Sequence, residues 1–510
     1  MTTENPTKLK EVLVVTPHSL PVTHKRALTP SPELSSPNQI CILSPDAVFS
    51  SDQEVVRLSD SPLLAPSKNL FPLGEATINR RSQIKTTHAH PEPLEVPESE
   101  SPVIQIPPSR HIVLPFNLRE KQTFHRDSAQ LMQLFPDTKK ILFDGYFLVF
   151  LLGSLPPKPW PLTIAGVQPY FTTDPNDEGP MPSMKRMSKS RLFVDAEIDV
   201  THLPPSQVDN AFELVFDFFT KTQISITQVQ YWGNFFMIVL ENEDTDLTAV
   251  PRSIGCCTCF YLFDKEVRRP TQDQLPARRL TEPTADVVDN SKYDILRPGV
   301  MLSSGICSPT GPEYLTTSGA LVEDSNSGER YITVASHGFP HGDKVFHPCA
   351  NGEEIGQIIM EIAHTDIAIA KLHDDVPYVN DTFESPFDGI QPTQLRNFVT
   401  ADSLKPGDMV YMNSPFVGYS EGVCGPHTRE RIPCDNSSQP IFEWIRTRWC
   451  YMGQGSTESL QDGVRGSAIW DKDGNVIGFF RFAPASGHFL DWSFCVGADH
   501  IIERDFKIVK

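Results

Sequence analysis

The sequence predicts a multi-domain chain that ends in an all-β domain, and two observations carry this prediction. From residue 297 to residue 510, short apolar runs recur between Gly, Pro, Asn and Asp, a pattern typical of strands in a barrel or sandwich. Residues 1–110 are instead rich in Pro, Ser, Thr and charge, with few aromatic side chains. Such a segment buries too little apolar surface to offset its chain entropy. We therefore expect a disordered tail, then an α+β middle domain, then the all-β domain.

The charge balance and the start of the chain argue against several kinds of partner. Lys and Arg number 44 against 64 Asp and Glu, a net charge of −20, which argues against nucleic acid or an anionic membrane surface as a partner. The first residues lack the features of a secretory signal. The longest apolar run, Ile141 to Leu155, is interrupted by Asp144-Gly145 and is too short to span a bilayer. We expect an intracellular protein, cytoplasmic or nuclear, that is not secreted.

Residues 111–265 mix helical and strand patterns and predict an α+β domain. Residues 118–135 have a helical pattern, and residues 139–152 read as a hairpin that turns at Asp144-Gly145. A Pro-rich connection then leads to about residue 188. Residues 266–296, which contain Arg268-Arg269-Pro270, predict a polar linker to the C-terminal domain.

The clearest part of the middle domain is residues 190–265. The expected elements are a strand over 192–200, a helix after Pro204-Pro205, a hairpin over 224–232 and 235–240, a short helix near Leu247, and a strand over 257–263. This βαββαβ order suggests a ferredoxin-like sandwich. Such a sheet can bind RNA through surface aromatics, but no basic residue precedes Phe235 and Phe236, so we assign both to the core.

The cysteine and histidine spacing gives no strong metal signature. The cysteine cluster is Cys256, Cys257 and Cys259, and no second pair at zinc-finger spacing follows it. A second candidate set is His337, His341, His347 and Cys349. The last three lie in a Gly- and Pro-rich loop without a helix to hold metal ligands, which favours satisfied surface histidines. We expect no metal and no cofactor.

Three segments of the C-terminal domain carry a chemical pattern. An apolar run over 331–335 leads through Ser336 to His337, and Asp366 precedes the apolar run 367–372. Further on, the loop Gly463-Val464-Arg465-Gly466-Ser467-Ala468 leads into an apolar strand, an Asp-Gly-Asn turn and a second apolar strand. In this order the segments resemble the His, Asp and nucleophile segments of the chymotrypsin/trypsin-like serine protease superfamily.

The resemblance covers the last two-fifths of the chain and implies a double β-barrel over 297–510. It implies that His337 is the general base, Asp366 its orienting carboxylate, Gly463 and Arg465 the backbone donors of the oxyanion hole, and Phe480, Arg481 and Phe482 the substrate-binding strand. The nucleophile position, however, holds Arg465, whose permanently charged guanidinium is not a nucleophile. We expect this guanidinium to pair with Asp366 or a neighbouring acid.

Three functions remain open at this stage. In the first, the domain is a pseudoprotease that does not cleave and binds a peptide or protein partner in the cleft between its barrels. In the second, it is an active serine endopeptidase that uses Ser467 as the attacking residue together with His337 and Asp366. In the third, the middle α+β domain is an interaction scaffold. The oligomeric state is left open.

Overall fold

The fold is known from a computed structural model of the 510-residue chain. The structure describes residues 40–43, 111–119, 124–158, 160–177, 179–181, 205–233, 235–255, 257–267, 288–307, 313–339, 344–362, 365–383, 392–433, 442–456, 460, 462–484 and 487–510. The expected disordered tail over 1–110 and the expected strand over 192–200 therefore lie outside the described residues, apart from the short strand β1 (Ile40–Leu43). No helix in the described part of the chain is long and apolar enough to cross a bilayer.

The chain divides into two compact units, which are described separately. One unit covers Pro32–Gly179 and the other contains Pro180–Lys510. Residues 205–267 thus group with the C-terminal residues, whereas the sequence placed them in one domain with residues 111–179. The physical reason is strand pairing: β7 (Ile226–Tyr231) forms an antiparallel ladder with β20 (Gly418–Pro433), so both belong to one sheet.

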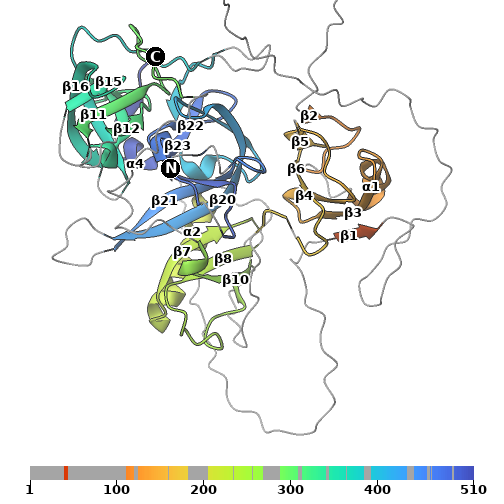
Figure 1. The fold of residues 1–510 in the computed structure, drawn as a ribbon. Helices are drawn as coiled ribbons and strands as arrows, with labels where there is room; N and C mark the ends of the chain where they lie inside the picture. The colour runs from red at the N-terminus through yellow and green to blue at the C-terminus, as the bar shows by residue number, and fades with distance from the viewer. Residues whose placement is uncertain are drawn as a thin grey trace, which may run out of the picture. The chain divides into compact units, whose positions relative to one another are not determined.

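The first unit is a small sheet packed on one helix, with β2 (His111–Ile112) and β5 (Thr163–Ile164) paired beside it (Figure 1). The sheet order is β1-β3-β4-β6, with β3 at Thr138–Phe143, β4 at Phe147–Leu152 and β6 at Gln168–Thr172, and the helix α1 covers Phe124–Met132. The predicted hairpin is confirmed, and the backbone amides of Tyr146 and Phe147 donate to the Asp144 carboxylate in its turn. The rings of Phe135, Phe150 and Phe171 pack together in the core.

Residues 205–267 form helices and strands at one end of the sheet that also contains β20. The elements are α2 (Pro205–Thr222), β7, β8 (Phe235–Leu240), β9 (Ser253–Ile254), β10 (Cys257–Phe263) and α3 (Asp264–Val267). The predicted hairpin and last strand are present, and β8 and β10 run parallel. The prediction of a short helix near Leu247 is wrong, because the segment forms turns closed by the amides of Thr245 and Ala249. Because one expected strand is not described, the ferredoxin-like assignment stays a prediction.

The C-terminal residues are mostly β, as expected. One sheet contains β11 (Met301–Cys307), β12 (Glu313–Thr317), β13 (Leu321–Asp324), β14 (Arg330–Ala335), β15 (Lys344–His347), β16 (Glu353–Ile362), β17 (Ile367–Leu372) and β25 (Phe506–Ile508). The described strands of this sheet follow the order β12-β11-β15-β16-β17-β14-β13-β25. The short helix α4 (Asp499–Ile502) precedes β25.

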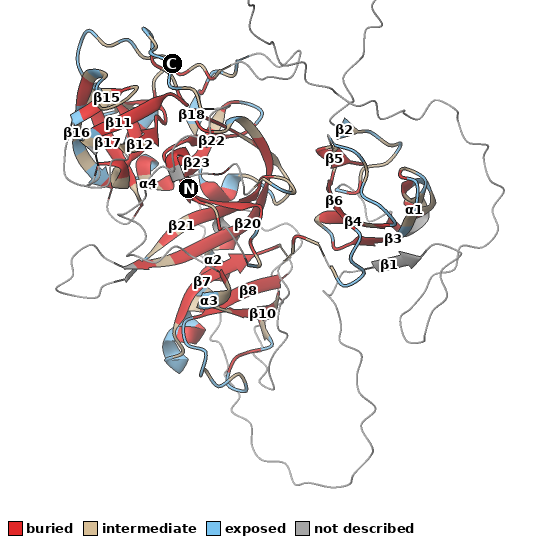
Figure 2. Ribbon diagram, in the orientation of Figure 1, coloured by how far each residue is buried: buried red, intermediate tan, exposed pale blue. Residues whose placement is uncertain are grey.

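The second sheet joins the C-terminal half to β7–β10. It adds β18 (Asn397–Phe398), β19 (Met409–Ser414), β20, β21 (Phe442–Tyr451), β22 (Ala468–Trp470), β23 (Asn475–Phe482) and β24 (Trp492–Gly497). Among the described strands the order is β19-β22-β23-β24-β21-β20-β7-β8-β10-β9, with β18 beside β23. Figure 2 shows that buried residues line most of β20–β24. Closure of each sheet into a barrel stays a prediction.

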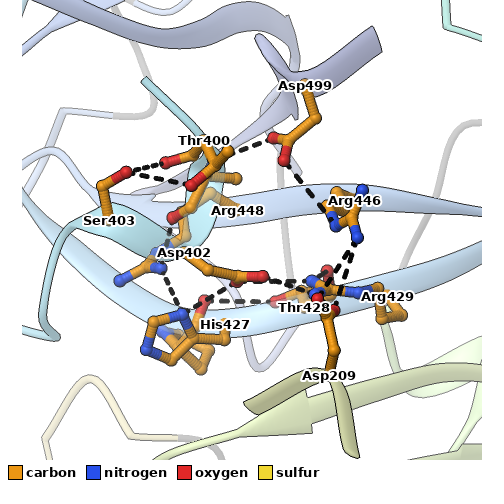
Figure 3. Close-up of polar contacts among 12 residues, drawn as sticks. Asp209, Thr400, Asp402, Ser403, His427, Thr428, Arg429, Arg446, Arg448 and Asp499 are labelled. Carbon is orange, nitrogen blue, oxygen red and sulfur yellow. Dashed lines mark hydrogen bonds and ion pairs between the residues drawn. The ribbon is translucent and has the colours of Figure 1, made fainter. Parts of the chain in front are cut away.

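A buried polar network fastens α2 to this second sheet (Figure 3). Asp402 accepts hydrogen bonds from the guanidinium of Arg429 and from Nδ1 of His427, the latter at 2.9 Å. Arg429 also donates to Asp209 on α2 at 2.7 Å. Arg448 donates to the carbonyls of Ala401 and Leu404, each at 2.6 Å. These bonds tie the helix, β20, β21 and the 3₁₀ turn η3 (Ala401–Ser403) together.

We predict that Asp402→Ala strongly destabilises the second unit. The side chain of Asp402 is only 4% exposed, and its removal leaves the buried charge of Arg429 without its closest partner. Breaking a buried pair in this way costs about 3–5 kcal/mol. Equilibrium urea unfolding measures the loss. Asp473→Ala, which breaks an exposed pair with Lys472, is the control and should cost less than about 1 kcal/mol. Equal effects of the two substitutions would contradict this role.

We also predict that the stability of this unit falls as the pH drops from 6.5 towards 4. Burial and then the Arg448 charge lower the pKa of His427 from 6.5 to about 4. The unfolded chain therefore binds this proton at a higher pH than the folded chain, and full stability is present only above pH 6.5. Between pH 6.5 and pH 4, the free energy of unfolding falls by up to about 3 kcal/mol.

The contribution of His427 to this pH dependence is measured with the variant His427→Gln. Glutamine keeps a donor for Asp402 but does not titrate. The pKa values of His347 and His500 are also lowered, first by burial, so part of the pH dependence remains in the variant. Unfolding curves recorded from pH 7.5 to pH 4 should be flatter for His427→Gln than for the wild type. Identical slopes would show that His427 titrates normally in the folded chain.

Candidate functional site

His337 and Asp366 meet because two neighbouring strands end side by side. β14 and β17 are antiparallel with Ala335 opposite Ile367, so the residue after β14 faces the residue before β17. The Ser336 amide donates to the Asp366 carbonyl at 3.0 Å, which closes the ladder. His337 follows in the 3₁₀ turn η2 (Ser336–Gly338). Asp366 has φ +64°, a left-handed conformation that Asp tolerates better than most residues.

Asp366 is held by donors from the segment that carries His337. Its Oδ1 accepts from the Ser336 hydroxyl and the His337 amide, each at 3.0 Å, and both of its oxygens lie 2.6 Å from His337 Nδ1. Burial raises the pKa of Asp366, but the His337 charge and hydrogen bond, followed by the Arg481 charge, outweigh it and keep this pKa below its usual value. The carboxylate therefore stays ionised and orients the imidazole.

The loop that carries Arg465 is anchored to the first sheet. Thr317 Oγ1 donates to the Gly463 carbonyl at 2.7 Å, and Thr316 Oγ1 donates to the Arg465 carbonyl at 2.8 Å. Gly466 has φ +85°, and a Cβ there would lie 2.7 Å from the Thr317 carbonyl oxygen, so the turn requires glycine. The loop is thereby fixed against β12, and its central side chain is directed toward the end of β14.

The structure brings Arg465 to the predicted pair, on the carboxylate side of the imidazole. Arg465 Nη1 lies 3.4 Å from His337 Nδ1 and 3.8 Å from Asp366 Oδ2. Because Nδ1 is already 2.6 Å from the carboxylate, it donates to Asp366 and cannot accept from Arg465. The Arg465 side chain is 1% exposed. A buried cation thus lies beside the oriented imidazole, on the side of the ring that faces Asp366.

The other predicted site residues have distinct positions. The Ser467 hydroxyl is fully buried and donates to the Val464 carbonyl at 2.6 Å, so it is committed within its own loop. Within the described residues, no hydroxyl or thiol forms a hydrogen bond with the His337 ring. Gly463 lies in the 3₁₀ turn η4 (Asp462–Val464). Such a turn directs amides to carbonyls three residues earlier. The oxyanion-hole role of Gly463 and Arg465 stays a prediction.

The predicted substrate-binding strand runs beside this loop. The Phe480 amide donates to the Ser467 carbonyl at 2.9 Å, and the Phe480 carbonyl accepts from the Gly466 amide at 3.1 Å. Phe480 and Phe482 are buried, whereas Arg481 is partly exposed and acts on Asp366 through its charge. The electrostatic effect of Arg481 on Asp366 was not predicted. The sequence feature that could have indicated this effect is the single cationic residue in the apolar run Phe479-Phe480-Arg481-Phe482.

The candidate metal ligands do not gather among the described residues. His341 lies outside these residues, and His347 is buried, not on the surface as expected. Its Nδ1 donates to the Met301 carbonyl at 2.7 Å, and its Nε2 accepts from the Tyr293 amide at 2.9 Å. In the part of the chain that the structure describes, no group of three or more His, Cys, Asp or Glu side chains could hold a metal ion. Cys257 is buried in β10.

Comparison with solved structures finds chymotrypsin/trypsin-like serine proteases. A protease from Nocardiopsis is 11% identical, with a TM-score of 0.30, and the match covers 42% of this chain and 100% of that one. A chymotrypsin from Cellulomonas bogoriensis is also 11% identical, with a TM-score of 0.30 and coverage of 42% and 98%. No protein-family model and no curated protein matches the sequence.

We predict that Arg465→Met leaves the free energy of unfolding unchanged or raises it by up to about 2 kcal/mol. Within the described part of the chain, Arg465 Nε and Nη2 are buried without hydrogen-bond partners, so the native state carries their desolvation cost, which methionine removes. Arg448→Met is the matched control, because both η nitrogens of Arg448 bind carbonyls and it should cost several kcal/mol, roughly 3–5. Urea unfolding compares them. A loss at position 465 as large as that at position 448 would make Arg465 a structural residue.

Proposed function

We propose that this chain is a protease-like protein that does not cleave peptide bonds and that binds an extended peptide or protein partner through its C-terminal domain. The observation that carries the proposal is the buried Arg465 guanidinium, 3.4 Å from His337 Nδ1 and 3.8 Å from Asp366. General-base catalysis of acyl transfer needs a hydroxyl or thiol within hydrogen-bond reach of the base. The orienting pair is retained here, but the attacking atom is replaced by a cation.

The proposed partner lies along the end of β23, beside Arg481 and Phe482. Phe482 pairs with Phe494 of β24 on one side. On the other side, β22 pairs with β23 only as far as Phe479, and within the described residues no strand pairs with Arg481 or Phe482 there. An extended peptide adds readily to an unpaired strand edge through backbone hydrogen bonds. This binding mode requires no catalytic residue.

The alternative of an active endopeptidase is less well supported by the geometry. Ser467 would have to break its 2.6 Å hydrogen bond with the Val464 carbonyl and leave a fully buried position to reach His337. Its amide is also engaged, because it donates to the same carbonyl at 3.1 Å. Both bonds hold Ser467 inside the turn.

The alternative of an independent scaffold in residues 205–267 is also less well supported. β7 pairs with β20 over four residues, from Tyr231 opposite His427 to Gln228 opposite Glu430. Arg429 and Arg446 contact Asp209 of α2 at 2.7 Å and 3.3 Å. Residues 205–267 therefore extend the C-terminal sheet, and a surface on them belongs to the same structural body as the His337 site.

The catalytic part of the proposal is tested with a fluorophosphonate probe on the full-length protein. We expect no covalent labelling of the wild type, because neither Ser467 nor another described hydroxyl is bonded to His337. Intact mass spectrometry measures the labelling. A labelled wild type whose modification is lost in Ser467→Ala would establish the endopeptidase and overturn the proposal.

The complementary variant is Arg465→Ser, which places a hydroxyl at the nucleophile position. We expect slow labelling at position 465, slower than in a working protease because the 3₁₀ turn engages the loop amides. The double variant Arg465→Ser with His337→Ala is the matched control and should stay unlabelled. Labelling that does not depend on His337 would show that the imidazole is not aligned as a base.

A further inference from the structure

The guanidinium of Arg465 has two edges with different surroundings. Nη1 faces His337 and Asp366 at 3.4 Å and 3.8 Å. Nε and Nη2 are buried and have no hydrogen-bond partner among the residues that the structure describes. The side chain is 1% exposed, so water does not solvate this second edge from the surface. An unpaired buried donor costs free energy, more so when it belongs to a charged group.

The acceptor beside Arg465 is already committed to other donors. Asp366, 3.8 Å from Arg465 Nη1, accepts from the Ser336 hydroxyl and from the amide and ring of His337. Arg481 acts on Asp366 through its charge, and Nη1 of Arg481 is buried without a hydrogen-bond partner among the described residues. An anion would accept from the unpaired donors of Arg465.

The geometry of the free edge selects the class of anion. Nε and Nη2 of an arginine present two parallel N–H bonds on one side of a planar group, and a carboxylate accepts both at once. A phosphate would bring further oxygens that need donors of their own. Val464, which precedes Arg465 in the loop, is buried and apolar and offers no such side-chain donor. A carboxylate therefore fits this edge better than a phosphate.

We infer that the Nε–Nη2 edge of Arg465 binds a carboxylate of the peptide that lies along β23. This inference rests on the proposed function and names its ligand chemistry: an acidic side chain or a free C-terminus. Because the edge has no contact with solvent in this structure, ligand entry requires a shift of the loop that carries Arg465. The residue at the degenerate nucleophile position is then a binding residue.

The test uses the full-length protein and a panel of fluorescent octapeptides whose binding is followed by anisotropy. Each sequence is made in three forms: Glu with an amidated C-terminus, Gln with an amidated C-terminus, and Gln with a free C-terminus. Loss of the carboxylate should weaken binding about 10- to 100-fold, as expected for a charge-assisted bidentate contact. The comparison of the three forms on the wild type needs no protein variant, and it distinguishes a side-chain carboxylate from a terminal one.

Protein variants then assign the effect to position 465. Arg465→Met should abolish the preference for the carboxylate, and Arg465→Lys should keep only part of it, because lysine retains the charge without the two-pronged edge. Arg330→Met, which changes an exposed arginine of β14, is the control and should keep the full preference. A preference that persists in Arg465→Met overturns the inference.

The failure of the inference and the failure of the proposed function are distinguishable. If peptides bind and the three forms differ by less than about 3-fold, the carboxylate site is refuted while peptide binding stands. If no peptide in the panel binds the wild type, the proposed peptide-binding function is refuted, and the inference falls with it.

Discussion

The chemistry of the C-terminal site depends on one contact, the buried Arg465 guanidinium against the His337–Asp366 pair. It joins the two sheets, because Arg465 lies in the loop before β22 while His337 and Asp366 follow β14 and precede β17. A buried cation is tolerated only beside an anion. Asp366 supplies that anion, and its left-handed backbone and its hydrogen bonds from the His337 segment place it there.

This contact also defines what the site can and cannot do. The imidazole is oriented by a carboxylate, as a general base must be, but every contact of its ring in the described residues is made through Nδ1. The Arg465 side chain lies on the carboxylate side of the ring, with Nη1 3.4 Å from His337 Nδ1. This geometry is the basis of the proposal that the domain binds a peptide and does not cleave it.

A second constraint makes the middle residues part of the same body. The ladder between β7 and β20 and the network of Asp402 with Arg429 fasten α2 and its hairpin to the C-terminal sheet. The network is fully internal on the C-terminal side, where His427, Arg429 and Arg448 are buried. The network connects β20 and β21 through Arg429 and Arg448, and it binds α2 through Asp209. The sheet that carries β23 is therefore supported from one edge by residues from the middle of the chain.

The sequence by itself determined the local features of this protein. The strands at Arg330–Ala335 and Ile367–Leu372 were predicted to within one residue of the observed bounds, because an apolar run between Gly, Pro or polar residues is a short-range signal. The order of His337, Asp366 and Arg465 was read from motifs for the same reason. Only the tertiary structure decided which contacts they make: the approach of Arg465 from the Nδ1 side, the electrostatic effect of Arg481 on Asp366, the pairing of β7 with β20 and the turns near Leu247. These depend on residues far apart in the chain, whose packing leaves no periodic pattern in the sequence.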